Sequence, residues 1–119
     1  SQQILSTGDL TPTKAMSVFQ VNGEVDGLIP LNGGNSPVGT FMSAHNSALN
    51  WANHFNCNST AIQEDLNWGN TVLNSFTFSN CDDSHEIKYL IALNTGHGFR
   101  NEQTDIIAYN QIWEFLKQY

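Results

Sequence analysis

Apolar residues in this chain gather in three short runs, each bounded by turn-forming residues. Residues 15–21 form a nearly continuous apolar run before Asn22-Gly23, which is typical of a strand buried on both faces and followed by a turn. Residues 72–78 alternate between apolar and polar, which predicts a half-buried strand with a polar outer face. Residues 87–93 predict another interior strand, paired antiparallel with the previous one. We therefore expect about three strands.

Two further segments have apolar residues at helical spacing. Residues 40–55 fit one amphipathic helix. A second helix is expected to start near Thr104-Asp105, where a capping side chain and an acid suit the positive end of a helix, and to end with Lys117. Its wide apolar face consists of Ile106, Tyr109, Ile112, Trp113, Phe115, Leu116 and Tyr119. Because Trp51 and Trp113 recur at core spacing, we expect both in the core.

The order strand, helix, strand, strand, helix predicts a layered α/β domain. The chain has 119 residues, enough for one compact domain and too few for two. Residues 1–14 are expected to be a surface lead-in that buries little, and residues 57–70 are expected to be irregular. Three strands and two helices cannot cover both faces of a sheet, so we expect one open apolar face that needs a partner.

The charge of the chain excludes some classes of partner. Eleven acidic residues against four basic ones give a formal net charge of −7, which repels phosphate backbones and anionic membrane surfaces. Nucleic acid and membranes are therefore not expected as partners. The apolar runs are too short to cross a bilayer, and the first residues show no targeting signal.

The cysteine content indicates a compartment. Cys57 and Cys81 are an even pair in a lysine-poor, asparagine-rich chain, which suggests an oxidising, extracellular or periplasmic location. A disulfide between them would stabilise the fold by about 3 kcal/mol, and the alternative is two buried free thiols. No second pair of Cys or His falls at zinc-ligand spacing, so we expect no metal and no cofactor.

Two residues combine position and chemistry in a way that suggests catalysis. Asp26 follows the first strand, and His97 follows the last strand between Gly96 and Gly98. An acid and a base on tight loops beyond buried strands are two members of a hydrolase triad. The alternative is that Asp26 only shapes a turn and His97 packs in a loop. A nucleophilic serine on a Gly-x-Ser-x-Gly turn is missing from the sequence, and Ser36 follows a loop and lacks the second glycine.

Several short motifs together resemble a known family. Gly23-Glu24-Val25-Asp26-Gly27-Leu28-Ile29-Pro30 is similar to the Gly-x-x-Asp-x-x-Val/Ile-Pro segment of α/β-hydrolases. Across residues 15–119 the order and spacing of this segment, Gly33-Gly34, residues 50–57, Cys81, Gly96-His97 and residues 112–116 resemble secreted polyhydroxybutyrate depolymerase and feruloyl esterase-like proteins. The resemblance covers only the C-terminal part of that family's catalytic domain.

The resemblance implies a role for each matching residue. Asp26 would be the triad acid, His97 the general base and then acid, and Cys57–Cys81 a structural disulfide. Trp68 and Phe99 are weaker candidates for contact with substrate. Trp68 lies between Asn67 and Gly69 and can stack on an aromatic or polymeric substrate, or alternatively cap the core.

Our hypothesis is that the chain is the C-terminal portion of an α/β-hydrolase fold that cleaves carboxylic esters. The nucleophilic serine and the oxyanion hole would come from a segment before residue 1 or from another chain, so that this polypeptide alone is inactive. The alternative is a noncatalytic, secreted, disulfide-bonded α/β module that uses an open apolar face for protein association.

Overall fold

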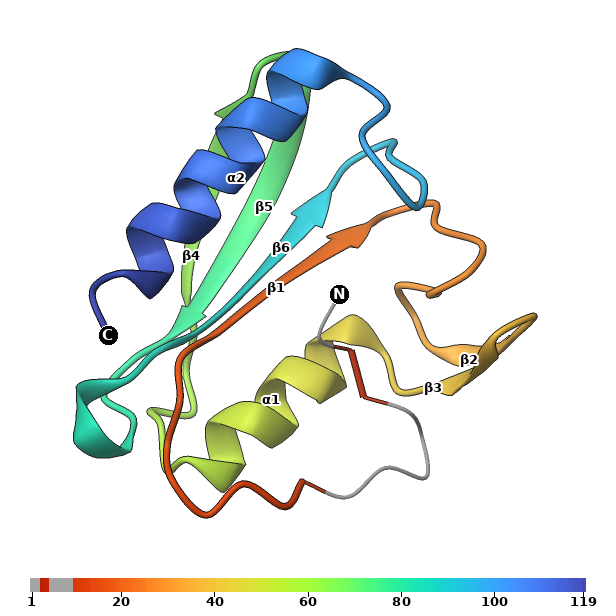
Figure 1. The fold of residues 1–119 in the computed structure, drawn as a ribbon. Coiled ribbons are helices and arrows are strands. Elements are labelled where there is room, and N and C mark those ends of the chain that lie inside the picture. The colour runs from red at the N-terminus through yellow and green to blue at the C-terminus, as the bar shows by residue number, and fades with distance from the viewer. Residues whose placement is uncertain (1–2, 5–9) are drawn as a thin grey trace.

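The computed structural model describes residues 3–4 and 10–119 (Figure 1). Its centre is a four-stranded mixed sheet in the order β1-β6-β5-β4. β1 runs parallel to β6, and the other two neighbouring pairs are antiparallel. The strands are β1 (Val18–Gly23), β4 (Ile62–Trp68), β5 (Thr71–Phe78) and β6 (Ile87–Ala92). The α/β architecture expected from the sequence is therefore present.

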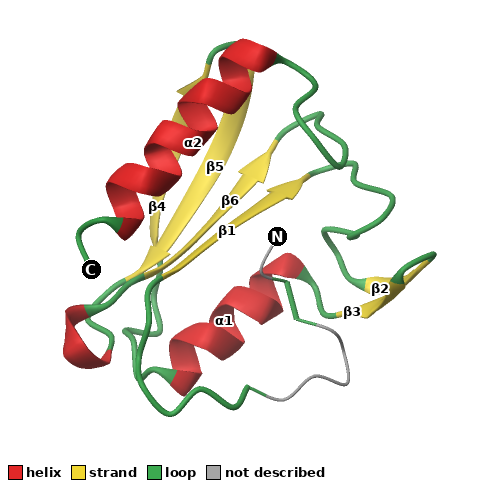
Figure 2. Cartoon of the chain, in the orientation of Figure 1, coloured by secondary structure: helices red, strands yellow, loops and turns green. Residues whose placement is uncertain are grey.

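One helix packs on each face of this sheet (Figure 2). α1 (Ala44–His54) lies against β1 and β6, and α2 (Glu102–Leu116) packs on the other face, against β1 and β4. Successive residues of a strand point to opposite faces, and in β6 Tyr89 belongs to the core beside α1 while Leu90 belongs to the core beside α2. A helix therefore lies on each face of the sheet, whereas one face was expected to be left open.

Both helices begin at a capping side chain. Ser43 caps α1 by accepting a hydrogen bond from the Asn46 amide, and Asn101 caps α2 by accepting one from the Thr104 amide. Such caps satisfy amides that have no partner within the helix. The second helix thus starts two residues before the expected position near Thr104.

The segment from residue 57 to 70 is not irregular as expected, because it contains β4. This strand forms a hairpin with β5 in which Trp68 pairs with Thr71 across Gly69-Asn70. Gly69 has a positive φ of 62°, a backbone conformation that glycine adopts without steric cost. The hydrophobic pattern missed β4 because most of its side chains face solvent.

The loop at residues 32–37 contributes to a second, two-stranded sheet. Its strands are β2 (Gly34–Ser36) and β3 (Gly39–Phe41), paired antiparallel. The lead-in also differs from expectation where it is described, because Gln3 and Ile4 are buried. The amide of Ile4 donates to Oγ of Ser47, and the Gln3 side chain donates to the carbonyl of Pro30. The rest of the lead-in includes residues 1–2 and 5–9, which lie outside the described residues.

α2 packs on the sheet through its smaller residues and leaves large ones exposed. Thr104, Ala108 and Phe115 are buried. The outward residues form what we call the α2 stripe: Ile106, Tyr109, Trp113 and Leu116, which are 53%, 69%, 64% and 43% exposed. The expectation that Trp113 lies in the core is wrong, whereas Trp51 is half-buried and packs against the core beside α1.

The two edges of the sheet differ in charge. β4 forms one edge and presents exposed Gln63, Glu64 and Asp65. β1 forms the other edge and has no charged residue, and in the part of the chain that the structure describes no strand pairs with its free side. Charged side chains protect a sheet edge against pairing with another strand. Only the β4 edge carries that protection.

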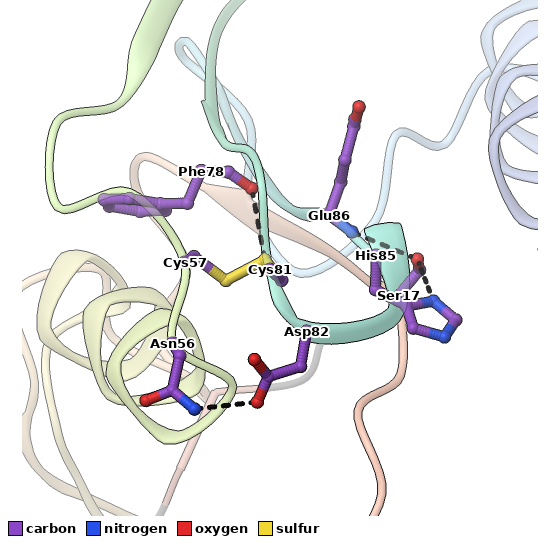
Figure 3. The surroundings of a disulfide bond; sticks show 8 residues. All are labelled: Ser17, Asn56, Cys57, Phe78, Cys81, Asp82, His85 and Glu86. Carbon is purple, nitrogen blue, oxygen red and sulfur yellow. Dashed lines mark hydrogen bonds between the residues drawn. A yellow bond between two sulfur atoms is a disulfide. The ribbon is translucent and has the colours of Figure 1, made fainter.

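A disulfide joins Cys57 and Cys81, so the alternative of two free thiols is wrong (Figure 3). Close to it the Asn56 side-chain amide donates to the Asp82 carboxylate at 2.7 Å. Ser17, just before β1, hydrogen-bonds Nδ1 of His85 and accepts from the Glu86 amide. These contacts connect the end of α1 and the start of β1 to the turn before β6.

Among the described helices, none has the length and apolar content required to span a membrane.

Candidate functional site

The candidate site is built by the two loops that follow β1 and β6. Because these strands are parallel neighbours, their carboxyl ends lie at the same end of the sheet (Figure 1). The Glu24 amide donates to the Ala92 carbonyl at 2.9 Å, and the Val25 amide donates to the Thr95 carbonyl at 3.0 Å. The Asn94 amide donates in turn to Oε1 of Glu24. Backbone pairing therefore continues past the strands and holds the loops together.

Gly23, the last residue of β1, allows this close approach. A Cβ atom built on Gly23 would lie 2.0 Å from the carbonyl oxygen of Gly96 and 2.4 Å from that of Thr95. No side chain fits at those distances, so glycine is required here for a steric reason. The position is three residues before Asp26, and Gly96 directly precedes His97.

Asp26 is fixed by its own turn. Its Oδ1 accepts hydrogen bonds from the amides of Leu28 at 2.8 Å and Ile29 at 2.9 Å. An aspartate that accepts from amides two and three residues later is a common turn-forming arrangement. The side chain is 6% exposed, and its second oxygen, Oδ2, faces His97.

Nδ1 of His97 lies 2.9 Å from Oδ2 of Asp26. Because a carboxylate only accepts hydrogen bonds, this contact places the ring proton on Nδ1 and leaves the lone pair of a neutral ring on Nε2. The His97 side chain is 54% exposed, and Nε2 makes no hydrogen bond to any residue that the structure describes. A basic nitrogen is thus presented at the surface and oriented by a buried acid.

The surroundings of Asp26 favour its charged form. Burial by itself raises the pKa of this carboxyl group, but the hydrogen bonds from Ile29, His97 and Leu28 and the charge of His97 together lower the pKa below its ordinary value. Asp26 therefore remains ionised at neutral pH, the state in which it can hold the His97 tautomer and stabilise a protonated ring.

Two cavities meet at the loop that carries His97. The larger, of about 650 Å³, extends from His97 to Asn70 and Thr71 in the β4–β5 turn and to Arg100. The smaller, of about 150 Å³, is lined by Asp26 and His97 together with the end of β1. His97 and Phe99 line both cavities, so the base lies where a bound molecule in either cavity can reach it.

The two aromatic candidates differ in position. Phe99 lines both cavities, whereas Trp68 is 2% exposed at the end of β4 and lines neither. The rings form an edge-to-face pair with centroids 5.7 Å apart, and the Thr104 hydroxyl donates to the Trp68 carbonyl. Trp68 thus lies in the core behind Phe99, in keeping with the core-capping alternative.

His45, His54 and Ser36 lie on other elements, α1 and β2. His45 hydrogen-bonds the Tyr89 hydroxyl, and Nε2 of His54 donates to the Pro12 carbonyl. Ser36 is on β2, and its hydroxyl accepts from the Val38 amide. The described residues contain no group of three or more His, Cys, Asp or Glu side chains that could hold a metal ion.

Three contributors to the site were not found in the sequence. They are the amides of Leu28 and Ile29, the close approach at Gly23, and Arg100 in the wall of the larger cavity. The Asp26-Gly27 pair is a turn signal that could have indicated the first. The second depends on which strands are neighbours, and local sequence contains no signal for that.

Comparisons with known proteins do not add to this picture. No protein-family model, no curated protein and no solved structure matches the chain.

Proposed function

We propose that this chain supplies the acid and the base of a serine carboxylic ester hydrolase with an α/β-hydrolase fold. The observation that carries the proposal is the Asp26–His97 contact at the carboxyl ends of two adjacent parallel strands. The backbone amides on Oδ1 orient the acid, the acid orients the base, and Nε2 of the base has an open approach. This is the support that a nucleophilic hydroxyl requires.

The reaction would use Nε2 twice. In the first step Nε2 accepts the serine proton while the serine oxygen bonds to the ester carbonyl carbon, and the bond to the alcohol breaks as Nε2 returns the proton to the leaving oxygen. In the second step Nε2 takes a proton from water while the water oxygen bonds to the acyl carbon, and it returns the proton to the serine oxygen as the bond between that oxygen and the acyl carbon breaks, which releases the carboxylic acid and the free serine. Asp26 stays ionised throughout and stabilises the protonated ring.

The serine would come from polypeptide outside these 119 residues. The described chain brings no serine hydroxyl to His97, and it offers the unprotected β1 edge at the side of Asp26. We propose that the serine-bearing segment, either an earlier part of the same protein or another chain, packs along β1. The disulfide is consistent with an extracellular or periplasmic location for the assembly.

The nucleophile and the base can be tested separately. A fluorophosphonate probe should label no serine of the 119-residue chain, and a mass shift on Ser36 or any other serine would refute an external nucleophile. If the serine belongs to an earlier part of the same protein, the coding sequence upstream of residue 1 should contain a Gly-x-Ser-x-Gly segment after a strand, and the complete protein should hydrolyse a p-nitrophenyl ester. His97→Ala in that protein should abolish turnover with unchanged folding, and unchanged turnover would remove His97 from the mechanism.

A noncatalytic association module is the second candidate function. The observation that favours it is the α2 stripe, because large apolar side chains exposed at helical spacing are typical of a surface that binds protein. A signal peptide directly before Ser1, with no serine-bearing domain, would favour this function over the hydrolase.

A further inference from the structure

The larger cavity beside His97 has an unusual charge for this protein. The chain carries eleven acidic and four basic residues, yet none of the described residues that line this cavity is Asp or Glu, and one of the basic residues, Arg100, is among them. The remaining lining residues are Asn, Thr and Gly residues together with His97, Phe99, Val72 and Leu93. The wall is therefore neutral to positive in a molecule that is otherwise strongly acidic.

Arg100 is not neutralised by a neighbour. Its guanidinium forms no salt bridge or hydrogen bond with any described residue, whereas the amine of Lys117 is paired with Glu114. Two acids beside the loop after β6 already accept hydrogen bonds: Oε1 of Glu24 accepts from the Asn94 amide, and Oδ2 of Asp26 accepts from Nδ1 of His97. Arg100 is an exposed residue of the cavity wall, so its guanidinium has no described protein partner to release before it binds another molecule.

The backbone holds Arg100 at this position. Arg100 has a φ of 53°, and Asn94 at the other end of the loop has a φ of 51°. A residue with a Cβ pays roughly 1 kcal/mol or more to adopt this left-handed conformation. Asn101 directly after Arg100 caps α2, so one side of the cavity wall is anchored to a helix.

We propose that the larger cavity selects esters that carry a carboxylate, such as monoesters of dicarboxylic acids, and that Arg100 binds this carboxylate. A planar guanidinium matches a carboxylate with paired hydrogen bonds, and such charge-assisted bonds are the strong ones. An anionic substrate is repelled by a protein of charge −7, so a local cation is needed where it binds. The proposal rests on the hydrolase function and specifies its substrate class.

The test is a binding measurement, because binding does not require the missing serine. The 119-residue chain, labelled with ¹⁵N, is titrated with monomethyl adipate and, separately, with the neutral dimethyl ester at constant ionic strength. The monoester should perturb amides of residues 70–72 and 94–100 and bind at least about tenfold more tightly than the diester, the effect expected from one charge-assisted pair.

Variants separate Arg100 from charge in general. Arg100→Asn removes the cation with a residue that tolerates a positive φ, and it should weaken monoester binding about tenfold. Lys117→Gln, which removes the same charge at an exposed position outside the cavity, should leave the affinity unchanged. Amide spectra away from residues 94–101 should coincide with wild type, which establishes that Arg100→Asn is folded.

Three results would overturn the proposal. They are equal affinity for the neutral diester, unchanged affinity in Arg100→Asn, and no perturbation of the cavity amides at millimolar monoester. Each of these leaves the Asp26–His97 couple in place. Conversely, a protein in which His97→Ala does not affect ester turnover refutes the hydrolase function even if the monoester binds at Arg100.

Discussion

Asp26 and His97 are 71 residues apart in the chain, and their side chains meet at 2.9 Å because β1 and β6 are parallel neighbours. Oδ1 of Asp26 is occupied by two backbone amides, so only Oδ2 faces the ring. The contact therefore has one orientation, with the His97 ring held by Nδ1 and exposed at Nε2.

This contact makes the free energy of unfolding depend on pH in the acid range. Because the pKa of Asp26 is lowered below 3.8 in the folded protein, the unfolded chain binds a proton at higher pH than the folded chain. The stabilisation is then fully present above the ordinary aspartate pKa and is lost as the pH falls through the lower folded value. Urea unfolding measured above and below pH 3.8 should show that the free energy of unfolding falls more steeply with decreasing pH for wild type than for Asp26→Asn.

The matched variant for this experiment is Asp65→Asn, which removes an exposed carboxylate on β4. It should retain the acid dependence of the wild type. Identical acid profiles for wild type and Asp26→Asn would show that the Asp26 contacts do not favour its charged form.

Gly23→Ala should separate the two loops. The added methyl group would overlap the carbonyl oxygens of Gly96 and Thr95, and such overpacking typically costs about 1–3 kcal/mol. The His97 Nδ1 proton should give a downfield NMR resonance in the wild type, and this resonance should be lost or broadened in Gly23→Ala. Gly27→Ala is the control, because a Cβ on Gly27 meets no atom within 4 Å, and a wild-type spectrum for Gly23→Ala would refute the close approach.

Removing the disulfide should destabilise the chain without altering the site. Cys57 and Cys81 are 24 residues apart, and closing a loop of that length stabilises by about 3 kcal/mol in the chain-entropy account. The double variant Cys57→Ala/Cys81→Ala should lose about this amount in urea unfolding and keep the His97 resonance. Ser59→Ala, at an exposed position in the same segment, should have the unfolding free energy of the wild type. Equal urea midpoints for the double variant and wild type would contradict a stabilising disulfide between Cys57 and Cys81.

The two faces of α2 provide a matched pair of aromatic truncations. Phe115 is 6% exposed and packs edge-to-face on Phe19 with centroids 5.2 Å apart, so Phe115→Ala should cost about 3 kcal/mol or more. Trp113 is 64% exposed, so Trp113→Ala should change the free energy of unfolding by less than about 0.5 kcal/mol. The reverse order of the two costs would mean that α2 packs on the sheet through its other face.

The sequence predicted the elements whose apolar pattern is dominated by the core. β1, β5 and β6 were found within three residues at each end, because buried strands require β-branched and aromatic residues. β4 was missed because an edge strand with exposed Gln63, Glu64 and Asp65 has little apolar signal. The face of α2 was misjudged because Thr104 and Ala108 pack on the sheet while larger residues stay outside.

For the site, the sequence predicted which side chains meet but not what surrounds them. Asp26 and His97 stand out because each follows an apolar run within a glycine-containing turn. Arg100 has no such local marker, and its place in the cavity wall depends on how the loop after β6 lies beside the β4–β5 turn. Cavities depend on tertiary packing, so a single sequence provides little information about them.

The unequal edges of the sheet limit how copies of this chain can aggregate. A strand added at β4 would confront Glu64 and Asp65, whereas β1 offers uncharged backbone. Each molecule has one edge strand without charged residues, so two copies paired through β1 would leave only their acidic β4 edges free to meet a third copy. Self-association by this route ends at pairs instead of growing into a ribbon.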